Sequence, residues 1–172
     1  KIWLQDSNLP TDRKYILYIG KCDIYKRPID LLEPFSKFSK KNEKYTLLIV
    51  GEGTGDYFKE LLRIAETLHI KDKVLITPPV KNTDIRKVFS IAEVAIWPHG
   101  SSMAMLEAMV CGCPVIAGNL DVNKERLGNK RGILFTKDDF NSLYEKMLLF
   151  DDLKDEVVKN AELWVKDYKW EN

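Results

Sequence analysis

Between Pro98 and Gly118 the sequence reads PHGSSMAMLEAMVCGCPVIAG, in which a glycine and two serines lead into an apolar run typical of a buried helix. The first turn of a helix has backbone N–H groups without intrahelical partners, and the helix dipole makes that end positive. Glycine lets an anion approach the backbone and serine adds hydroxyl donors, so Gly100, Ser101 and Ser102 predict a phosphate site. The alternative is that a serine caps the helix and the glycine only makes the turn.

Glu107 lies five residues beyond Ser102, among methionine, leucine and alanine. Its carboxylate has two oxygens that can accept hydrogen bonds from a vicinal diol, such as the two hydroxyls of a ribose. A sugar whose phosphates rest on the helix terminus would place its hydroxyls in this direction. The alternative is a glutamate on the helix surface that its neighbours partly shield.

A second group of charged residues follows the first apolar run, in the segment GKCDIYKR. Lys21 comes directly after that run, and Lys26 and Arg27 stand where a helix should begin. Cations at a helix N-terminus oppose the dipole, and a shared anion would offset this repulsion. The alternative is that these residues are solvated surface cations.

Other familiar motifs do not fit the sequence. The segment GEGTGD follows the second apolar run and does not match G-x-G-x-x-G, which speaks against a dehydrogenase. Neither a P-loop nor a G-x-S-x-G motif is present, and neither His69 nor His99 stands at metal-ligand spacing from the cysteines. The sequence therefore predicts no metal site and no nucleophilic triad.

The elements that must position these residues are visible as alternating patterns. Short apolar runs predict six strands, at residues 15–20, 45–51, 72–78, 94–98, 114–118 and 131–135. Helical spacing predicts six helices, at residues 27–41, 55–70, 82–92, 101–112, 137–150 and 151–168. Pro34 is expected to kink the helix at residues 27–41, and Asn82 is expected to cap the helix at residues 82–92. A short polar turn is expected to join Gly118 to Arg131.

Strands that are apolar throughout and alternate with helices indicate parallel strands covered on both faces. We therefore expect an α/β fold: a single domain with a doubly wound, Rossmann-like parallel sheet of about six strands and helices on both faces. Ligands of such sheets bind outside the carboxyl ends of the strands. The unusual residues follow the first four strands there, at Gly20–Lys21, Gly51–Gly53, Pro79–Val80 and His99–Ser102.

Composition limits the partners. The formal charge is +1 and 45 % of the 172 residues are hydrophobic, so no overall field favours nucleic acid. No apolar run is long enough for a transmembrane segment, and no signal peptide is visible. Three cysteines, an odd number, are expected to be reduced in a cytoplasmic protein. Since the sequence begins with lysine, it is expected to be a piece of a larger protein.

In this order the segments resemble the C-terminal, nucleotide-sugar-binding domain of family 4 (group 1) retaining glycosyltransferases, which have the GT-B fold. The resemblance covers most of the chain from Tyr15 to Glu171. YIGKCDIYKRPIDLL is similar to the family's strand-Gly-Arg-…-Lys-Gly-…-Asp-Leu-Leu opening, with Lys21 at the arginine and Lys26 at the lysine position. LLIVGEG, RGILF and above all LEAMVCGCPVIAG resemble further family segments.

The resemblance implies a donor site for a nucleoside-diphosphate sugar that needs neither metal nor cofactor. The diphosphate would rest on the loop Gly100–Met103, which includes Ser101 and Ser102, with Gly20, Lys21 and Lys26 close by. Glu107 would hold the ribose and Val80 would lie against the base. Lys21, Lys26 and His99 would be the catalytic residues, stabilising charge on the departing nucleoside diphosphate.

The resemblance also implies the organisation of a larger protein. Residues 15–172 would form the donor-binding domain, and residues 1–14 an N-terminal extension or a remnant of the interdomain linker. The partner would be the protein's own N-terminal acceptor domain, absent from this chain, without which the fragment is expected to be inactive. The acceptor is not identified; a glycan and a lipid-linked molecule are both open, the latter implying peripheral association with the cytosolic face of a membrane.

Two positions depart from the family pattern. The family usually has a glutamate eight positions before the one at Glu107, and here that position is His99. Histidine can still hydrogen-bond a sugar hydroxyl, and the alternative is a non-catalytic relative that binds a sugar nucleotide without transferring the sugar. Lysine at position 21 keeps the charge of the family's arginine but loses its bidentate fork.

Overall fold

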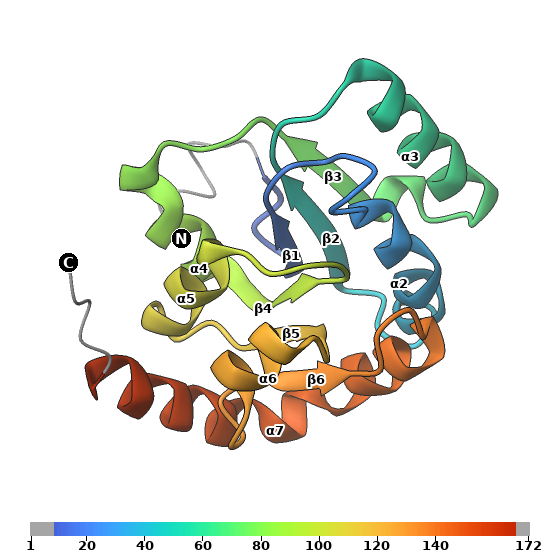
Figure 1. The fold of residues 1–172 in the computed structure, drawn as a ribbon. Coiled ribbons are helices and arrows are strands. Elements are labelled where there is room, and N and C mark those ends of the chain that lie inside the picture. The colour runs from blue at the N-terminus through green and yellow to red at the C-terminus, as the bar shows by residue number, and fades with distance from the viewer. Residues whose placement is uncertain (1–8, 168–172) are drawn as a thin grey trace.

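The computed structural model describes residues 9–167 and contains one six-stranded sheet in which every strand is parallel to its neighbours (Figure 1). The strand order is β3-β2-β1-β4-β5-β6, the order of a Rossmann fold. The predicted fold class is therefore confirmed, as are all six predicted strands. Their bounds are β1 Lys14–Ile19, β2 Tyr45–Val50, β3 Val74–Thr77, β4 Ala92–Trp97, β5 Val115–Gly118 and β6 Ile133–Phe135.

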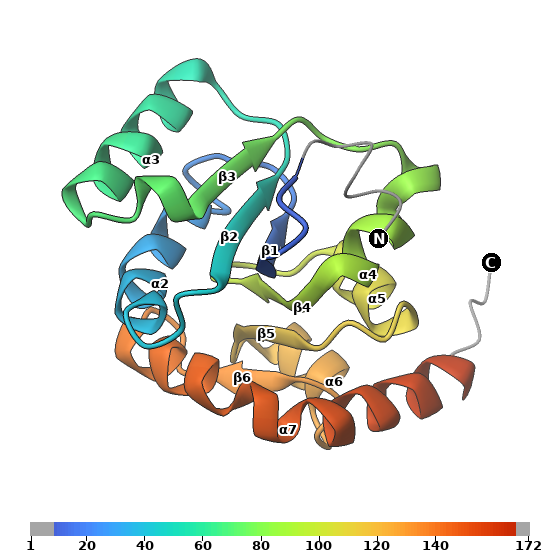
Figure 2. The same ribbon diagram turned by 180° about the vertical axis from the view of Figure 1, so that it is seen from behind.

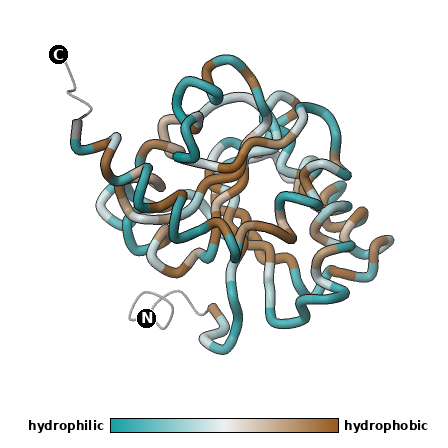
Figure 3. Tube along the Cα trace, turned by 90° about the horizontal axis from the view of Figure 1, so that it is seen from below, coloured by the Kyte–Doolittle hydropathy of each residue, from teal (hydrophilic) through white to brown (hydrophobic). Residues whose placement is uncertain are grey.

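Burial explains why these segments are strands. All six residues of β2 and five of the six in β1 are buried, as expected where helices cover both faces of a parallel sheet. Figure 3 shows the hydrophobic positions gathered along the central strands and the hydrophilic ones on the surrounding helices and loops.

Helices lie on both sides of the sheet. Figures 1 and 2 show α2 and α3 on one side and α4, α5 and α6 on the other. The helix α7 runs along the β6 edge and contacts both α2 and α5. The helix bounds are α2 Leu32–Ser39, α3 Gly55–Thr67, α4 Ile85–Ile91, α5 Met103–Val110, α6 Asp121–Leu127 and α7 Phe140–Asp167, with 3₁₀ turns at η1 Pro28–Leu31, η2 Lys71–Lys73 and η3 Asn82–Asp84.

Two expectations about single residues were wrong. Asn82 does not cap α4, because a 3₁₀ turn occupies Asn82–Asp84 and the helix follows it without a side-chain cap. Pro34 does not lie in the middle of a helix, because the segment divides into η1 and α2 and places Pro34 in the first turn of α2. Backbone N–H groups of the first turn have no intrahelical acceptor, so proline is tolerated there.

Two expectations about helices were also wrong. The segment between Gly118 and Arg131 is not only a polar turn, because it contains α6. The two C-terminal helices are one helix of 28 residues, α7. Neither glycine nor proline lies near the expected break at Phe150–Asp151, so nothing in the sequence ends the helix there.

The GEG segment after β2 has a structural explanation. A Cβ on Gly51 would lie 1.8 Å from the carbonyl oxygen of Gly20, so only glycine allows the ends of β1 and β2 to approach. Beyond the strand ends, Cys22 and Gly53 form an isolated parallel bridge. Gly51 and Gly53 therefore allow the loops after β1 and β2 to lie against each other.

Candidate functional site

The strands β1 and β4 are neighbours at the centre of the sheet, and the chain turns in opposite directions from them. The buried Trp97 at the end of β4 donates from Nε1 to the carbonyl oxygen of Ile19 at the end of β1, over 3.0 Å. This junction is the topological switch point, where open parallel sheets bind their ligands. The loops that follow β1 and β4 carry the first two groups of predicted residues.

The loop after β4 prepares the N-terminus of α5. Ser102 is the N-cap, and its Oγ accepts a hydrogen bond from the N–H of Ala104 over 3.2 Å. Among the described residues, no acceptor faces the backbone N–H groups of Ser101, Ser102 and Met103. A serine cap and a set of N–H groups open to an anion therefore occur together at this helix end.

Lys26 reaches this helix end from the loop after β1. Its Nζ donates to the carbonyl oxygen of Ser101 over 2.7 Å, although the two residues lie 75 positions apart. Asp23 shapes the loop by accepting from the N–H groups of Tyr25 and Lys26, over 2.9 and 2.8 Å. These bonds, first of all that from Lys26, lower the pKa of Asp23.

Gly100 makes the approach of Lys26 possible. Its φ is +70°, and a Cβ at this position would lie 3.1 Å from the Lys26 ammonium. Side chains are disfavoured at such φ values, and here one would also crowd the cation. Glycine is therefore favoured at this position of GSS, both by its backbone conformation and by the nearby cation.

Lys21 and Gly20 lie at the start of the same loop. Lys21 is exposed, and its ammonium makes no hydrogen bond or ion pair with residues in the described part of the chain. Its carbonyl oxygen accepts from the hydroxyl of Tyr18 over 2.5 Å, which fixes the backbone after Gly20. The structure therefore brings Lys26 to Ser101 but leaves Lys21 without a contact there.

His99 is held by carboxylates. Its Nε2 lies 2.6 Å from Oδ2 of Asp30 and its Nδ1 lies 3.5 Å from Oδ1 of Asp138. Asp30 also accepts two hydrogen bonds from Arg27, over 2.7 and 2.9 Å, and the ring of Phe140 meets the imidazole edge to face. Because a carboxylate ion-paired with arginine can only accept, Nε2 of His99 is the donor.

Glu107 and Val80 lie apart from these contacts. Glu107 is half-buried in α5, and no ion-pair or hydrogen-bond partner for its carboxylate occurs within residues 9–167. Val80 packs against the core in the loop after β3. A hollow of about 340 Å³ lies beside it, lined by Gly51, Glu52, Gly53, Phe58, Thr77 and Pro79 among others.

Sequence reasoning missed two residues of this region, both in α6. Arg126 donates from Nη1 to Oγ of Ser101 over 2.6 Å and to the carbonyl oxygen of Ser102 over 3.2 Å. Asn123 is fully buried and donates from Nδ2 to the carbonyl oxygens of Gly100 and Gly118, over 3.0 and 2.9 Å. The available signal was their spacing of three residues, which places both on one face of a helix, but no helix was expected there.

The sequence profile described as "Glycosyl transferases group 1" matches residues 1–167 of this chain. The chain belongs to this family. It is 30 % identical over 126 residues to D-inositol 3-phosphate glycosyltransferase 2 of Catenulispora acidiphila, a match that covers 67 % of this chain and 30 % of that protein. This group 1 chain thus spans less than a third of that curated relative's length.

Two crystal structures have a similar fold. One is the C-terminal domain of the group 1 glycosyl transferase LpcC from Francisella tularensis, with a TM-score of 0.81, 19 % identity, and coverage of 95 % of this chain and 89 % of that one. The other is HepE from Anabaena in complex with UDP and glucose, with a TM-score of 0.82, 17 % identity, and coverage of 96 % of this chain and 47 % of that one. The chain has the Rossmann-like C-terminal domain of a GT-B glycosyltransferase.

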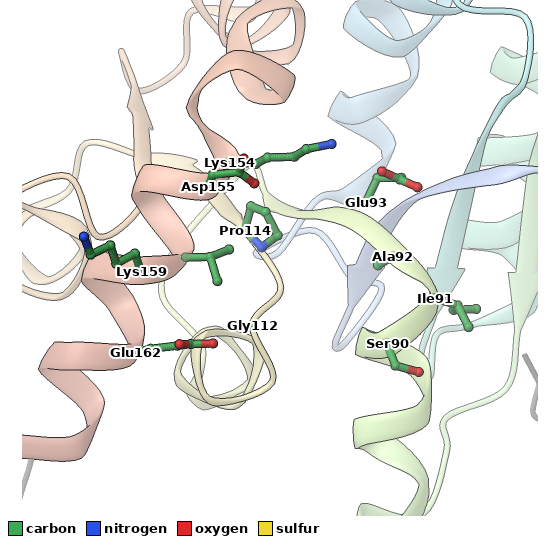
Figure 4. Close-up of a pocket in the computed structure, with 11 residues that line it drawn as sticks. Ser90, Ile91, Ala92, Glu93, Gly112, Pro114, Lys154, Asp155, Lys159 and Glu162 are labelled. Carbon is green, nitrogen blue, oxygen red and sulfur yellow. The ribbon is translucent and has the colours of Figure 1, made fainter.

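A larger hollow of this group 1 chain lies elsewhere. It has a volume of about 440 Å³ and opens at the amino ends of β4 and β5, between α4 and α7 (Figure 4). Figure 4 shows acidic and basic side chains together around it. Its lining includes Ser90, Glu93, Gly112, Lys154, Asp155 and Glu162.

Three further findings concern metals, cysteines and membranes. No group of three or more His, Cys, Asp and Glu side chains in the described part of the chain is placed to hold a metal ion. The three cysteines are free, and burial raises the pKa of Cys22 to about 11 and that of Cys113 to about 12, so both are thiols at neutral pH. No helix within residues 9–167 is long and apolar enough to cross a membrane.

Proposed function

We propose that this chain is the donor-binding half of a retaining glycosyltransferase, which moves a sugar from a nucleoside-diphosphate sugar to an acceptor. The observation that carries the proposal is the junction at the switch point, where the Lys26 ammonium lies 2.7 Å from the Ser101 carbonyl beside open N–H groups. Family membership gives the reaction class. Residues 15–172 would be the donor domain and residues 1–14 the extension that leads into it.

The diphosphate would dock on the N–H groups of Ser101, Ser102 and Met103, with Lys26 at its side and Lys21 swinging in from the exposed loop. A helix N-terminus and an ammonium together favour the accumulation of negative charge. As the glycosidic bond to the phosphate breaks, charge builds on the departing nucleoside diphosphate, and these groups would stabilise it. Residues of this chain would thus stabilise the negative charge on the departing nucleoside diphosphate.

The nucleoside and the donor sugar would extend in opposite directions from the diphosphate. Glu107, half-buried and without a described partner, would accept from the ribose hydroxyls. The base would enter the hollow of about 340 Å³ beside Val80. His99, which Asp30 holds through Nε2, would exchange the 3.5 Å contact of its Nδ1 with Asp138 for a hydroxyl of the donor sugar. The UDP and glucose named with the HepE structure support a donor of this chemical class.

The acceptor would be bound mostly by the protein's N-terminal domain. The matches support this, because they cover only 30 % of the length of the curated relative and 47 % of the HepE chain. Sugar transfer would need both halves, so donor binding is the property to test on this chain.

A nucleotide titration tests the proposal. UDP, GDP and ADP are added to the chain and the rise in melting temperature is measured, since a ligand that binds only the folded state stabilises it. At least one of the three should stabilise the chain, and Glu107→Gln should abolish the preference for that nucleotide over its 2′-deoxy form. Glu93→Gln, at the opposite end of β4, is the matched control. No stabilisation by any of the three at millimolar concentration would contradict the proposal.

The position of His99 keeps one alternative open, a relative that binds a sugar nucleotide without transfer. Both imidazole nitrogens face carboxylates, at 2.6 and 3.5 Å, so the ring is already engaged within the chain. Such a relative would bind the nucleotide as the enzyme does. Sugar transfer by the full-length protein would rule it out, and a large gain on His99→Glu would support it.

A further inference from the structure

A second cation reaches the N-terminus of α5, from a different element than Lys26. Arg126 of α6 donates from Nη1 to the Ser101 hydroxyl and to the Ser102 carbonyl, over 2.6 and 3.2 Å. Lys26 donates to the carbonyl oxygen of the same Ser101. Ser101 is therefore held by an ammonium from the loop after β1 and a guanidinium from the helix after β5.

The position of Arg126 is fixed by the fold. One turn earlier in α6, the buried side chain of Asn123 ties the helix to the carbonyl oxygens of Gly100 and Gly118. At the other end, Arg131 donates from Nε to the carbonyl oxygen of Arg126 over 3.0 Å. The helix therefore presents its arginine to the GSS loop from a constrained backbone.

The charge of Arg126 lacks a counter-charge. Two nearby cations are ion-paired, Lys124 with Asp121 and Arg27 with Asp30. In contrast, neither Arg126 nor Lys26 has a carboxylate within ion-pair distance anywhere in residues 9–167. Two half-buried cations thus converge on a helix end that is itself positive, an arrangement that an anion would stabilise.

The guanidinium also has donors to spare. An arginine side chain carries five N–H groups, and the hydrogen bonds of Arg126 within the described part of the chain use only Nη1. Nε and Nη2 remain for two phosphate oxygens, the bidentate geometry in which arginine exceeds lysine. The family pattern has arginine at position 21, and this sequence has lysine there. The bidentate guanidinium that the family supplies at that position is therefore replaced by a single ammonium.

We infer that Arg126 is a third diphosphate-binding cation, which binds the phosphate distal to the nucleoside together with Lys26. This inference rests on the proposed function and extends it to a residue and a helix that the family resemblance did not indicate. Because arginine stays protonated, its charge acts throughout the reaction and most strongly when the departing diphosphate is fully charged.

The test compares nucleoside diphosphate with nucleoside monophosphate, using UDP and UMP or whichever base the wild-type chain binds. Affinities are measured by calorimetry for the wild type, Arg126→Gln and Arg126→Met. Glutamine keeps an N–H donor for the GSS loop and removes the charge. Since a hydrogen bond to a charged group is worth more than a neutral one, both variants should lose about tenfold or more in diphosphate affinity. Monophosphate affinity should change much less.

Lys124→Gln is the matched control, because this cation lies on the same helix and is paired with Asp121. It should keep the wild-type ratio of diphosphate to monophosphate affinity. If Arg126 only shapes the loop, Arg126→Gln will weaken both ligands equally or neither, and either result overturns the inference. A wild-type chain that binds no nucleotide overturns the proposed function itself, so the two failures are distinguishable.

Discussion

The two ends of β4 differ in how charge is arranged. At the carboxyl end, Lys26 and Arg126 meet the N-terminus of α5 without a carboxylate partner among the described residues. At the amino end, acidic and basic side chains share the lining of a hollow of about 440 Å³ (Figure 4). Positive charge without a described carboxylate partner, held at a constrained backbone, is the feature that supports the proposed anion site.

The parallel sheet explains this difference. All six strands point in the same direction, so loops that leave their carboxyl ends gather on one side and lead into helix N-termini. Helix C-termini gather at the other end, where the dipole favours cations. Substitutions matched between the two ends can therefore separate binding from stability.

The largest difference is expected for the two lysines. Lys26→Gln removes a cation from the α5 terminus and should weaken nucleoside diphosphate binding by about 1.5–3 kcal/mol, the range for hydrogen bonds to charged groups. Lys154→Gln at the hollow should leave the affinity unchanged, because Lys154 is ion-paired with Asp151 at 2.9 Å. Calorimetric titration measures both. Equal losses in the two variants would break the comparison.

The next difference is expected for two glycines that share a backbone conformation. Gly100 has φ +70° and Gly112, which lines the hollow, has φ +68°. Alanine at either position should lower the free energy of unfolding by about 1–2 kcal/mol, because a side chain disfavours this region. Only Gly100→Ala places a methyl group against the Lys26 ammonium, so it alone should weaken diphosphate binding.

Urea unfolding and the same titration measure these two effects. The comparison is sharpened if the variants are equally destabilised and differ only in affinity. It fails if Gly112→Ala weakens the nucleotide as much as Gly100→Ala.

The smallest effect is expected for Asp151, next to the hollow. Burial raises the pKa of this carboxyl, but the Lys154 ammonium and the Tyr45 hydroxyl outweigh it, so the pKa lies below the ordinary 3.8. A lowered pKa stabilises the fold above the unfolded value, and this contribution is lost as pH falls through the folded value. Asp151→Asn should therefore cost about 0.5 kcal/mol at about pH 7, the range of exposed ion pairs.

Urea unfolding of wild type and Asp151→Asn at about pH 7 and about pH 3 checks this sign. The difference in unfolding free energy should shrink at the lower pH, because the carboxyl of the unfolded wild type takes up a proton there and that of the folded protein begins to do so. A difference that grows on acidification would contradict the assigned direction.

The sequence allowed the strands and the α5 junction to be predicted because both are local patterns. Each strand is a short apolar run, and the GSS loop directly precedes an apolar helix. The helix α6 was not predictable in this way, because only Val122 and Leu127 are hydrophobic among its seven residues. With the helix, the positions of Asn123 and Arg126 were missed as well.

The partner of His99 could not be predicted for a different reason. Asp30 lies 69 positions away, and only the neighbouring placement of β1 and β4 brings the two side chains within 2.6 Å. Such a contact leaves no periodic signal in the sequence. The roles of Lys21, Glu107 and Val80 stay predictions, since no hydrogen bond or ion pair within residues 9–167 joins their side chains to the Lys26–Ser101 junction.

The helix α7 has a mechanical consequence. With 28 residues it is about 42 Å long, and it touches α2 on one side of the sheet and α5 on the other. The helices on the two faces of the sheet could therefore separate only if α7 bent or unfolded. Heat or denaturant should therefore melt the domain as one cooperative unit, and the N-terminus of α5 should unfold in the same transition as the far side of the sheet.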